Sequence, residues 1–125
     1  MKGKVAIVTG GASGIGFAIV ESLAQAGVNC VIADMDVPGG ERTEAKLKAG
    51  GYTSLFVKTN VSSSDDVRHL VDAAVEKFGR LDIMVNNAGL QFVAPVVDFP
   101  EERWNLLIGV MLTGAFLCCK YSLRT

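Results

Sequence analysis

A short glycine-rich stretch near the start of the chain has the composition of a phosphate-binding loop. Residues Thr9 to Gly16 read TGGASGIG, and apolar runs precede and follow this stretch. The loop is therefore expected to join a strand to a helix. A pyrophosphate can lie against the free backbone N–H groups at such a helix N-terminus, and a Cβ atom would hold it away. Gly10, Gly14 and Gly16 are predicted to bind a dinucleotide, with simple turn formation as the alternative.

One acidic residue supports this interpretation. Asp34 lies 18 residues after Gly16, at the end of the apolar run Asn29–Ala33. A carboxylate at that position can accept hydrogen bonds from the ribose hydroxyls and would repel a 2′-phosphate. No Lys or Arg lies in the loop from Gly11 to Ser13, and Met35 follows the acid. NAD(H) is therefore predicted in preference to NADP(H).

The elements that must position these residues alternate along the chain. Apolar runs at 5–9, 29–33, 55–59 and 81–85 are the expected strands. Helices are expected at 15–26, 41–49 and 67–78, and a further helix, with a break, from about residue 100 to the end. Strands that are apolar on both faces and separated by helices indicate a covered parallel sheet. With right-handed crossovers the strand order is 3-2-1-4, the first half of a Rossmann-type doubly wound α/β fold.

Composition limits the classes of partner. The net charge is −1 with acids and bases interspersed, so no nucleic-acid partner is expected. No uninterrupted apolar run approaches the roughly 20 residues that span a bilayer, and the glycine loop breaks the first apolar segment, so neither a membrane span nor a signal peptide is expected. The three cysteines have no metal-ligand spacing and are expected to be reduced thiols of a cytoplasmic protein. The 125 residues are expected to form one domain.

Two motifs together resemble the classical short-chain dehydrogenase/reductase family. They are TGGASGIG at 9–16 and NNAG at 86–89, and the likeness covers essentially all 125 residues. It implies an NAD-dependent oxidoreductase of a small molecule, commonly a homotetramer. The resemblance assigns the phosphates to Ser13, Gly14, Ile15 and Gly16, the ribose to Asp34, the adenine to Asn60 and Val61, and the border of the ribose to Asn87, Ala88 and Gly89. Asn60 replaces the Asp of many members, and its amide can still pair with the edge of adenine.

A narrower likeness runs from Asn86 to Trp104. This segment, NNAGLQFVAPVVDFPEERW, resembles bacterial D-3-hydroxybutyrate dehydrogenases. The resemblance implies that Gln91 binds the substrate carboxylate through its amide N–H. An ordinary polar loop residue is the alternative.

The proton relay that the family uses is absent from these residues. That relay is a Ser and a Tyr-x-x-x-Lys pair, whereas Tyr52 is followed four residues on by Phe56 and Tyr121 by Thr125. Met111 occupies the position of the family's helical Asn and is expected to lie in the core. The chain is thus predicted to be the cofactor-binding half of a longer dehydrogenase, with no catalytic residue of its own. A non-catalytic NAD(H)-binding module or sensor is the alternative.

Overall fold

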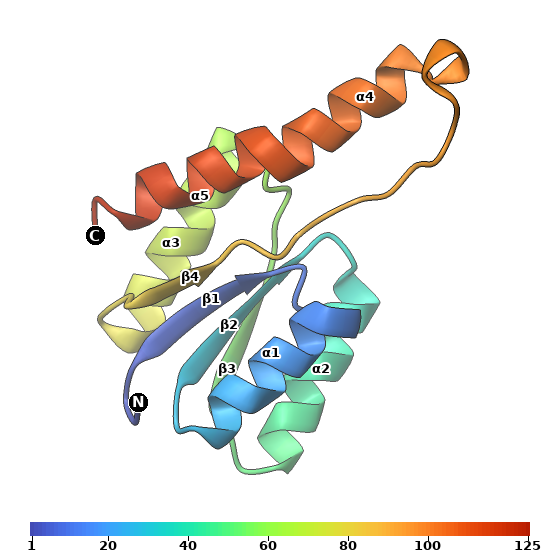
Figure 1. Ribbon diagram of the computed structural model, residues 1–125. Helices are drawn as coiled ribbons and strands as arrows, with labels where there is room; N and C mark the ends of the chain where they lie inside the picture. Colours follow the sequence, from blue (N-terminus) through green and yellow to red (C-terminus); the bar gives the residue numbers. More distant parts are fainter.

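Four parallel strands form one sheet in the order β3-β2-β1-β4 (Figure 1). The computed structural model describes residues 1–125. The strands are β1 (Val5–Thr9), β2 (Asn29–Asp34), β3 (Ser54–Lys58) and β4 (Ile83–Val85). Strand β1 is central, since it pairs with β2 on one side and with β4 on the other. The predicted order is confirmed, and β4 is an edge strand of only three residues.

Helices cover both faces of the sheet. Helices α1 (Gly14–Gln25) and α2 (Val37–Ala49) lie on one face, and α3 (Ser64–Phe78) and α5 (Gly114–Ser122) lie on the other (Figure 1). The chain reaches α5 through the 3₁₀ turn η1 (Val96–Asp98), helix α4 (Glu101–Ile108) and a π-helical turn, η2 (Gly109–Thr113). The break predicted in the last helix is this π-helical turn, through which the helix continues.

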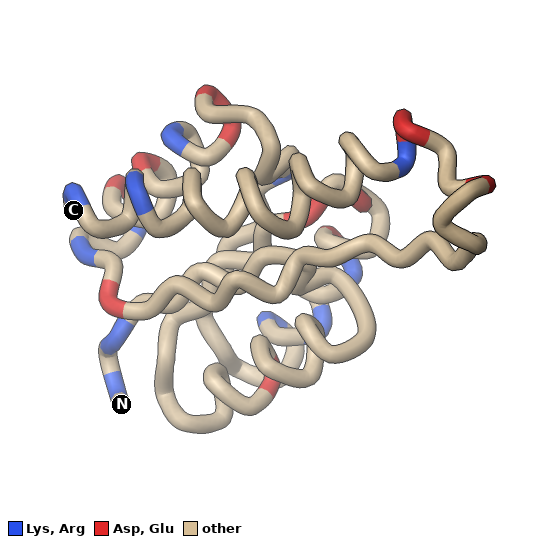
Figure 2. The backbone as a smooth tube through the Cα atoms, turned by 45° about the horizontal axis from the view of Figure 1, so that its top comes forward, with Lys and Arg blue, Asp and Glu red and all other residues tan.

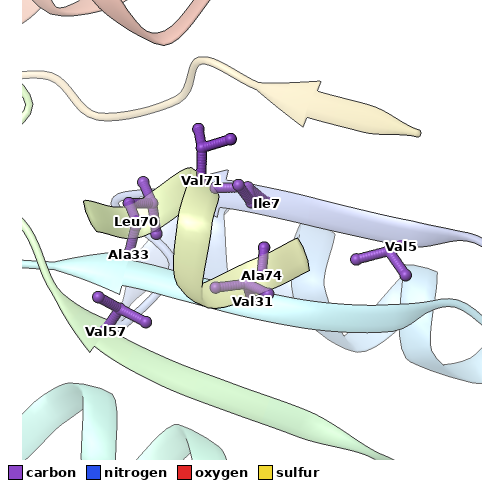
Figure 3. Packing of buried hydrophobic residues seen from close by; sticks show 8 residues of the cluster. All are labelled: Val5, Ile7, Val31, Ala33, Val57, Leu70, Val71 and Ala74. Atoms are coloured by element: carbon purple, nitrogen blue, oxygen red, sulfur yellow. The ribbon is translucent and has the colours of Figure 1, made fainter. Parts of the chain in front are cut away.

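The core on the α3 face is built from small branched side chains. Val5 and Ile7 of β1 lie beside Val31 of β2, and Leu70 and Ala74 of α3 pack over them (Figure 3). The alternate strand residues form a second cluster on the opposite face, under α1 and α2. All five residues of β1 are buried, as expected for a parallel strand covered on both faces.

Helix α2 begins earlier than the sequence pattern predicts. The polar pattern predicts a helix from 41 to 49, but α2 starts at Val37, so Pro38 and two glycines lie in its first turn. Proline is tolerated there because the first N–H groups of a helix have no intrahelical acceptor. The Asp36 side chain caps the helix by accepting a hydrogen bond from the Gly39 N–H at 3.1 Å. The cap compensates for the poor helix propensity of the glycines.

The C-terminal third of the chain carries an unusual amount of exposed apolar surface. Eleven of the fifteen exposed large hydrophobic residues lie there: Leu90, Phe92, Val93, Val96, Val97, Trp104, Leu106, Met111, Leu112, Phe116 and Leu123. Helix α4 and the segment before it project beyond the sheet (Figure 1). The continuous helix formed by α4, η2 and α5 has no charged residue between Arg103 and Lys120 (Figure 2). The accessible surface is 7260 Å², against about 6,400 Å² for a typical folded monomer of this mass. This face is therefore incompletely covered within the chain.

The helix that contains this face has the length and apolar composition of a membrane span. Glu101 to Ser122 form 22 continuous helical residues. A single helix of this kind is weak evidence for a span, because core helices of other proteins meet the same criteria. The sequence pattern predicts no such segment, because no uninterrupted apolar run approaches the roughly 20 residues that span a bilayer.

Candidate dinucleotide-binding site

A cavity of about 500 Å³ opens at the carboxyl ends of the four strands. It is lined from the ends of all four: Gly10 follows β1, Asp34 ends β2, Asn60 follows β3 and Asn87 follows β4. In an open α/β sheet, ligands bind at this edge where the strand order reverses, here between β1 and β4. The topology therefore brings together residues that lie far apart in the sequence, such as Gly10 and Asn87.

The cavity contains nearly all of the residues that the sequence predicts for cofactor binding. Those that line it are Gly10, Ser13, Ile15, Gly16, Asp34, Asn60, Val61, Asn87, Ala88 and Gly89. Gly14 lies on the other side of the loop, beside a second and shallower hollow. Gln91 is exposed and does not line the cavity, although its neighbour Leu90 does. The predicted role of Gln91 stays a prediction.

The glycines serve the packing of the loop itself. A Cβ on Gly16 would lie 2.0 Å from the Gly10 carbonyl oxygen, so the start of α1 could not lie against the loop. Gly10 has φ +68° and Gly14 has φ +56°, a left-handed conformation that favours glycine. A Cβ on Gly10 would also lie 2.9 Å from Asn87 Nδ2. The sequence pattern indicates glycines that let a ligand approach the backbone closely. The structure adds that Gly10 and Gly16 are also required for the close packing of the loop against α1 and Asn87.

The helix that follows the loop has free donors at its start. The first backbone N–H groups of α1 have no acceptor within the chain, and the Ser13 side chain does not cap the helix. Unpaired N–H groups and the helix dipole together favour an anionic group. Ile15 is 76% exposed beside them, which leaves its side chain free to contact a ligand. These donors fit the pyrophosphate of a dinucleotide.

Asp34 connects the glycine loop to the start of α2. Its Oδ2 accepts a hydrogen bond from the Ala12 N–H at 3.1 Å, and its Oδ1 accepts one from the Asp36 N–H at 3.0 Å. The Ala12 carbonyl in turn accepts from the Thr43 hydroxyl at 3.2 Å. A carboxylate has about four lone-pair positions, so two remain for ribose hydroxyls. The sequence pattern predicts that Asp34 binds the ribose, but it does not predict that its carboxylate also holds the glycine loop through the Ala12 N–H.

The Thr9 hydroxyl is a positioning group that the sequence analysis missed. It accepts hydrogen bonds from the backbone N–H groups of Asn87 and Ala88, both at 3.0 Å, and donates to the Val85 carbonyl at 3.2 Å. The Asn87 side chain donates back to the Thr9 carbonyl at 3.0 Å. The only signal in the sequence was a hydroxyl residue directly before the first glycine of the loop.

The C-terminal helix closes one side of the cavity. Leu106 of α4 and Val110 of the π-helical turn both line it, and neither was predicted. Met111 was expected in the core, but it is 52% exposed, so that prediction is wrong. The π-helical turn inserts an extra residue into the helix and shifts the period that the prediction assumed.

Comparison with known proteins agrees with this geometry. The family model described as short chain dehydrogenase matches residues 4–125, so the chain belongs to the short-chain dehydrogenase/reductase family. It is similar to the short chain dehydrogenase/reductase astE of Aspergillus oryzae, at 45% identity over 99% of this chain and 48% of the relative. An uncharacterized oxidoreductase of Thermotoga maritima is 40% identical over 97% of this chain and 47% of its own length. A probable NADP-dependent mannitol dehydrogenase of Yarrowia lipolytica is 38% identical over 98% of this chain and 45% of its own length.

The curated relatives are longer proteins. The chain spans about half the length of the relatives that it matches. The family resemblance inferred from the two motifs is confirmed, and so is the fold class. The homologues carry the names of oxidoreductases, which supports the class of reaction expected for the protein as a whole.

Proposed function

We propose that this chain is the NAD(H)-binding part of an oxidoreductase that acts on a small hydroxy or keto substrate. The observation that carries the proposal is the cavity, in which unpaired N–H groups at the start of α1 lie next to the carboxylate of Asp34. The N–H groups suit a pyrophosphate, and the carboxylate suits the ribose hydroxyls. The bound nicotinamide would supply the hydride chemistry.

Asp34 supports NAD(H) as the cofactor. Its carboxylate would repel a 2′-phosphate, and the loop from Gly11 to Ser13 offers no cation to offset that repulsion. The relative from Yarrowia lipolytica is named NADP-dependent, so preference within the family varies. Asp34→Ala tests both parts of the proposal, because it removes the ribose acceptor and the repulsive charge together.

The experiment is a titration of the purified protein with NADH and NADPH by fluorescence. Asp34→Ala is expected to weaken NADH binding about tenfold or more, which corresponds to the loss of one or two hydrogen bonds to a charged group. NADPH binding should improve relative to NADH. Asp36→Ala is the matched control, since it removes a neighbouring carboxylate that caps α2 and does not line the cavity. Unchanged NADH affinity in Asp34→Ala would contradict the proposal.

The proposal also includes the expectation that these 125 residues do not catalyse turnover on their own. Because neither tyrosine is followed four residues on by Lys, the chain by itself is expected to bind NADH without turnover. A proton relay must come from residues outside these 125. The likeness of residues 86–104 makes 3-hydroxybutyrate the first substrate to assay in a protein that also carries the Tyr-x-x-x-Lys pair. If the protein expressed from its native gene has an intact mass of 13.2 kDa and binds NADH, the alternative of a non-catalytic binding module would be supported instead.

The exposed apolar surface of η2 and α5 leads us to propose that this chain assembles with further protein. Met111, Leu112 and Phe116 are exposed on η2 and α5, and β4 is an unpaired sheet edge. Apolar surface of this kind marks contact with further protein. We propose that further chain of the same protein and a homo-oligomer partner cover it.

A further inference from the structure

Strand β3 forms the edge of the sheet opposite β4, and one side of it pairs with no other strand. The β2–β3 ladder includes a hydrogen bond from the Cys30 N–H to the Thr53 carbonyl. The backbone groups of successive residues in a strand point to alternate sides, so those of Ser54, Phe56 and Lys58 face away from β2. Such a row of outward N–H and carbonyl groups is a template on which a strand of another chain can pair.

The middle N–H of this row already has a partner within the chain. Glu44 of α2 accepts a hydrogen bond from the Phe56 N–H through its Oε2. The carboxylate therefore lies over the edge of the sheet, where the carbonyl of an adjacent strand would otherwise accept the same bond. Lys58 is exposed at the end of the row, and a charged side chain on an edge strand also opposes pairing.

The packing of α2 on β3 places Glu44 at this edge. Gly40 lies one turn before Glu44 on the same face of the helix. A Cβ on Gly40 would lie 2.0 Å from Phe56 Cε2, so the glycine lets the helix approach the strand closely. The neighbouring Thr43 hydroxyl donates to the Ala12 carbonyl at 3.2 Å and fastens α2 to the glycine loop. The position of the helix, and with it that of the Glu44 side chain, is thus fixed from two sides.

We propose that Glu44 keeps the free edge of the sheet closed, and that without its carboxylate β3 pairs with β3 of a second copy of this chain. The row of outward groups is the same on both copies, so an antiparallel pair about a twofold axis places each Phe56 opposite the other. In the native chain the Phe56 N–H is engaged, and two Glu44 carboxylates would meet across that axis. Pairing is therefore opposed by an occupied donor and by like charges.

The experiment measures amide hydrogen exchange of single β3 residues by NMR in the 125-residue chain, at several protein concentrations. In the wild-type chain, Phe56 should exchange at least about tenfold more slowly than Ser54 and Lys58 after correction for intrinsic rates, the effect of a hydrogen bond to a charged group. In Glu44→Ala at low concentration this protection should be lost. Exchange at Phe56 in the variant should slow again as the concentration rises, because the N–H then donates to the second copy. Wild-type exchange should not depend on concentration.

Two further changes control the interpretation. Glu41→Ala removes an exposed carboxylate three residues earlier on α2 and should behave as wild type. Ser54→Pro in the Glu44→Ala background removes an outward N–H at the first residue of the edge strand and no bond of the ladder. The double variant should lose the concentration dependence while Phe56 stays unprotected. Association through the exposed C-terminal surface would not alter exchange at β3, so the measurement is specific for this edge.

Each outcome decides the inference. Equal exchange of Phe56, Ser54 and Lys58 in the wild-type chain would overturn it, whether or not a variant folds. Fast exchange at Phe56 in Glu44→Ala at every concentration would also overturn it, because the edge would then be open without pairing. Glu44→Leu keeps the apolar stem of the side chain without the carboxylate and should give the same result as Glu44→Ala. None of these outcomes depends on NADH, so the inference and the proposed function fail independently.

Discussion

Thr9 and Asn87 bind each other in both directions across the ends of β1 and β4. The Asn87 N–H donates to Thr9 Oγ1, and Asn87 Nδ2 donates to the Thr9 carbonyl, both at 3.0 Å. Strand β4 has only three residues, and its last backbone pair joins Val8 to Val85. The Thr9–Asn87 pair therefore continues the β1–β4 connection past the strands. It joins the glycine loop to the NNAG segment, which face each other across the cavity.

Removing the Thr9 hydroxyl should loosen this junction. Thr9→Val keeps the shape of the side chain but leaves the Ala88 N–H without an acceptor. It also removes one of the two acceptors of the Asn87 N–H, which keeps its hydrogen bond to the Val85 carbonyl at 3.1 Å. Thr9 is buried, so we expect a loss of about 1–3 kcal/mol in the free energy of unfolding. Urea titration measures this loss, and NADH affinity should fall as well. Thr53→Val, at an exposed position before β3, should change neither quantity. Equal stability of Thr9→Val and wild type would mean that water replaces the hydroxyl.

Two glycines of the loop should respond differently to alanine. In Gly16→Ala the new Cβ would lie 2.0 Å from a backbone oxygen, so the start of α1 must move away from the loop. A displacement of about 1 Å at a binding site can cost about a hundredfold in function, so NADH affinity should fall at least about tenfold. In Gly14→Ala the Cβ would meet nothing within 4 Å, and the cost is the strain of φ +56°.

Both NADH affinity and the urea midpoint of unfolding should be measured for Gly14→Ala and Gly16→Ala. Gly14→Ala should lose about 1–2 kcal/mol of stability, with a smaller loss of affinity than Gly16→Ala. The opposite ranking of affinities would mean that ligand approach, and not packing within the loop, requires the glycine at position 16.

Local patterns predicted the sheet and the loop because short-range physics determines both. The buried run at Val5–Thr9 has no polar side chain before its end, as is typical of a strand covered on both faces. The four-glycine loop between a strand and a helix predicted a phosphate site for a similar reason. Asp34 was found from its spacing after Gly16. These features depend on neighbours in the sequence.

The features that were missed depend on partners far along the chain. Thr9 contacts Asn87 across 78 positions, and no periodicity reveals a single hydroxyl with three hydrogen bonds. Leu106 and Val110 reach the cavity because η2 lies against the turn after β3, where Gly109 is beside Ser62, a tertiary placement. The exposure of Met111 depends on the π-helical turn, which has no marker in the residue types of Gly109–Thr113. Tertiary context thus determines the walls of the site.

At the opposite end of the sheet, Asp82 should contribute to stability in a manner that depends on pH. Its side chain is 15% exposed and accepts hydrogen bonds from Arg80, from the Val5 N–H at 2.9 Å and from Lys4. The hydrogen bond from Arg80, followed by that from Val5, lowers the pKa of Asp82 below its ordinary value. A carboxyl whose pKa is lowered in the folded state contributes stability above its unfolded pKa, and loses it as the pH falls through the folded value.

Urea midpoints of wild type and Asp82→Asn test this dependence. The variant should be less stable at pH 7, and the difference should shrink as the pH falls below about 4, where unfolded Asp becomes protonated. Asp72→Asn is the control, because Asp72 is exposed on α3 and makes no hydrogen bond or ion pair. A difference that is constant from pH 7 to pH 3 would assign the effect of Asp82 to packing and not to its charge.

The adjacent cysteines at the end of the chain should differ in reactivity. Cys118 is fully buried against Val61, and burial raises the pKa of its thiol to about 11, with a smaller contribution from Cys119. Cys119 is exposed, and its Sγ accepts a hydrogen bond from Asn86 Nδ2 at 3.4 Å. Because the thiolate is the nucleophile, a buried thiol of raised pKa is inert at neutral pH.

Alkylation followed by mass spectrometry measures this difference. Iodoacetamide at pH 8 should add one group to the native chain, at Cys119, and three groups after unfolding in urea. Cys30 should stay unmodified in the native state, because burial raises its pKa to about 11 as well. Cys119→Ser should remove the native adduct and leave the other two sites protected. Rapid native labelling of Cys118 would mean that α5 leaves the sheet under native conditions, so that the wall formed by Leu106 and Val110 would open with it.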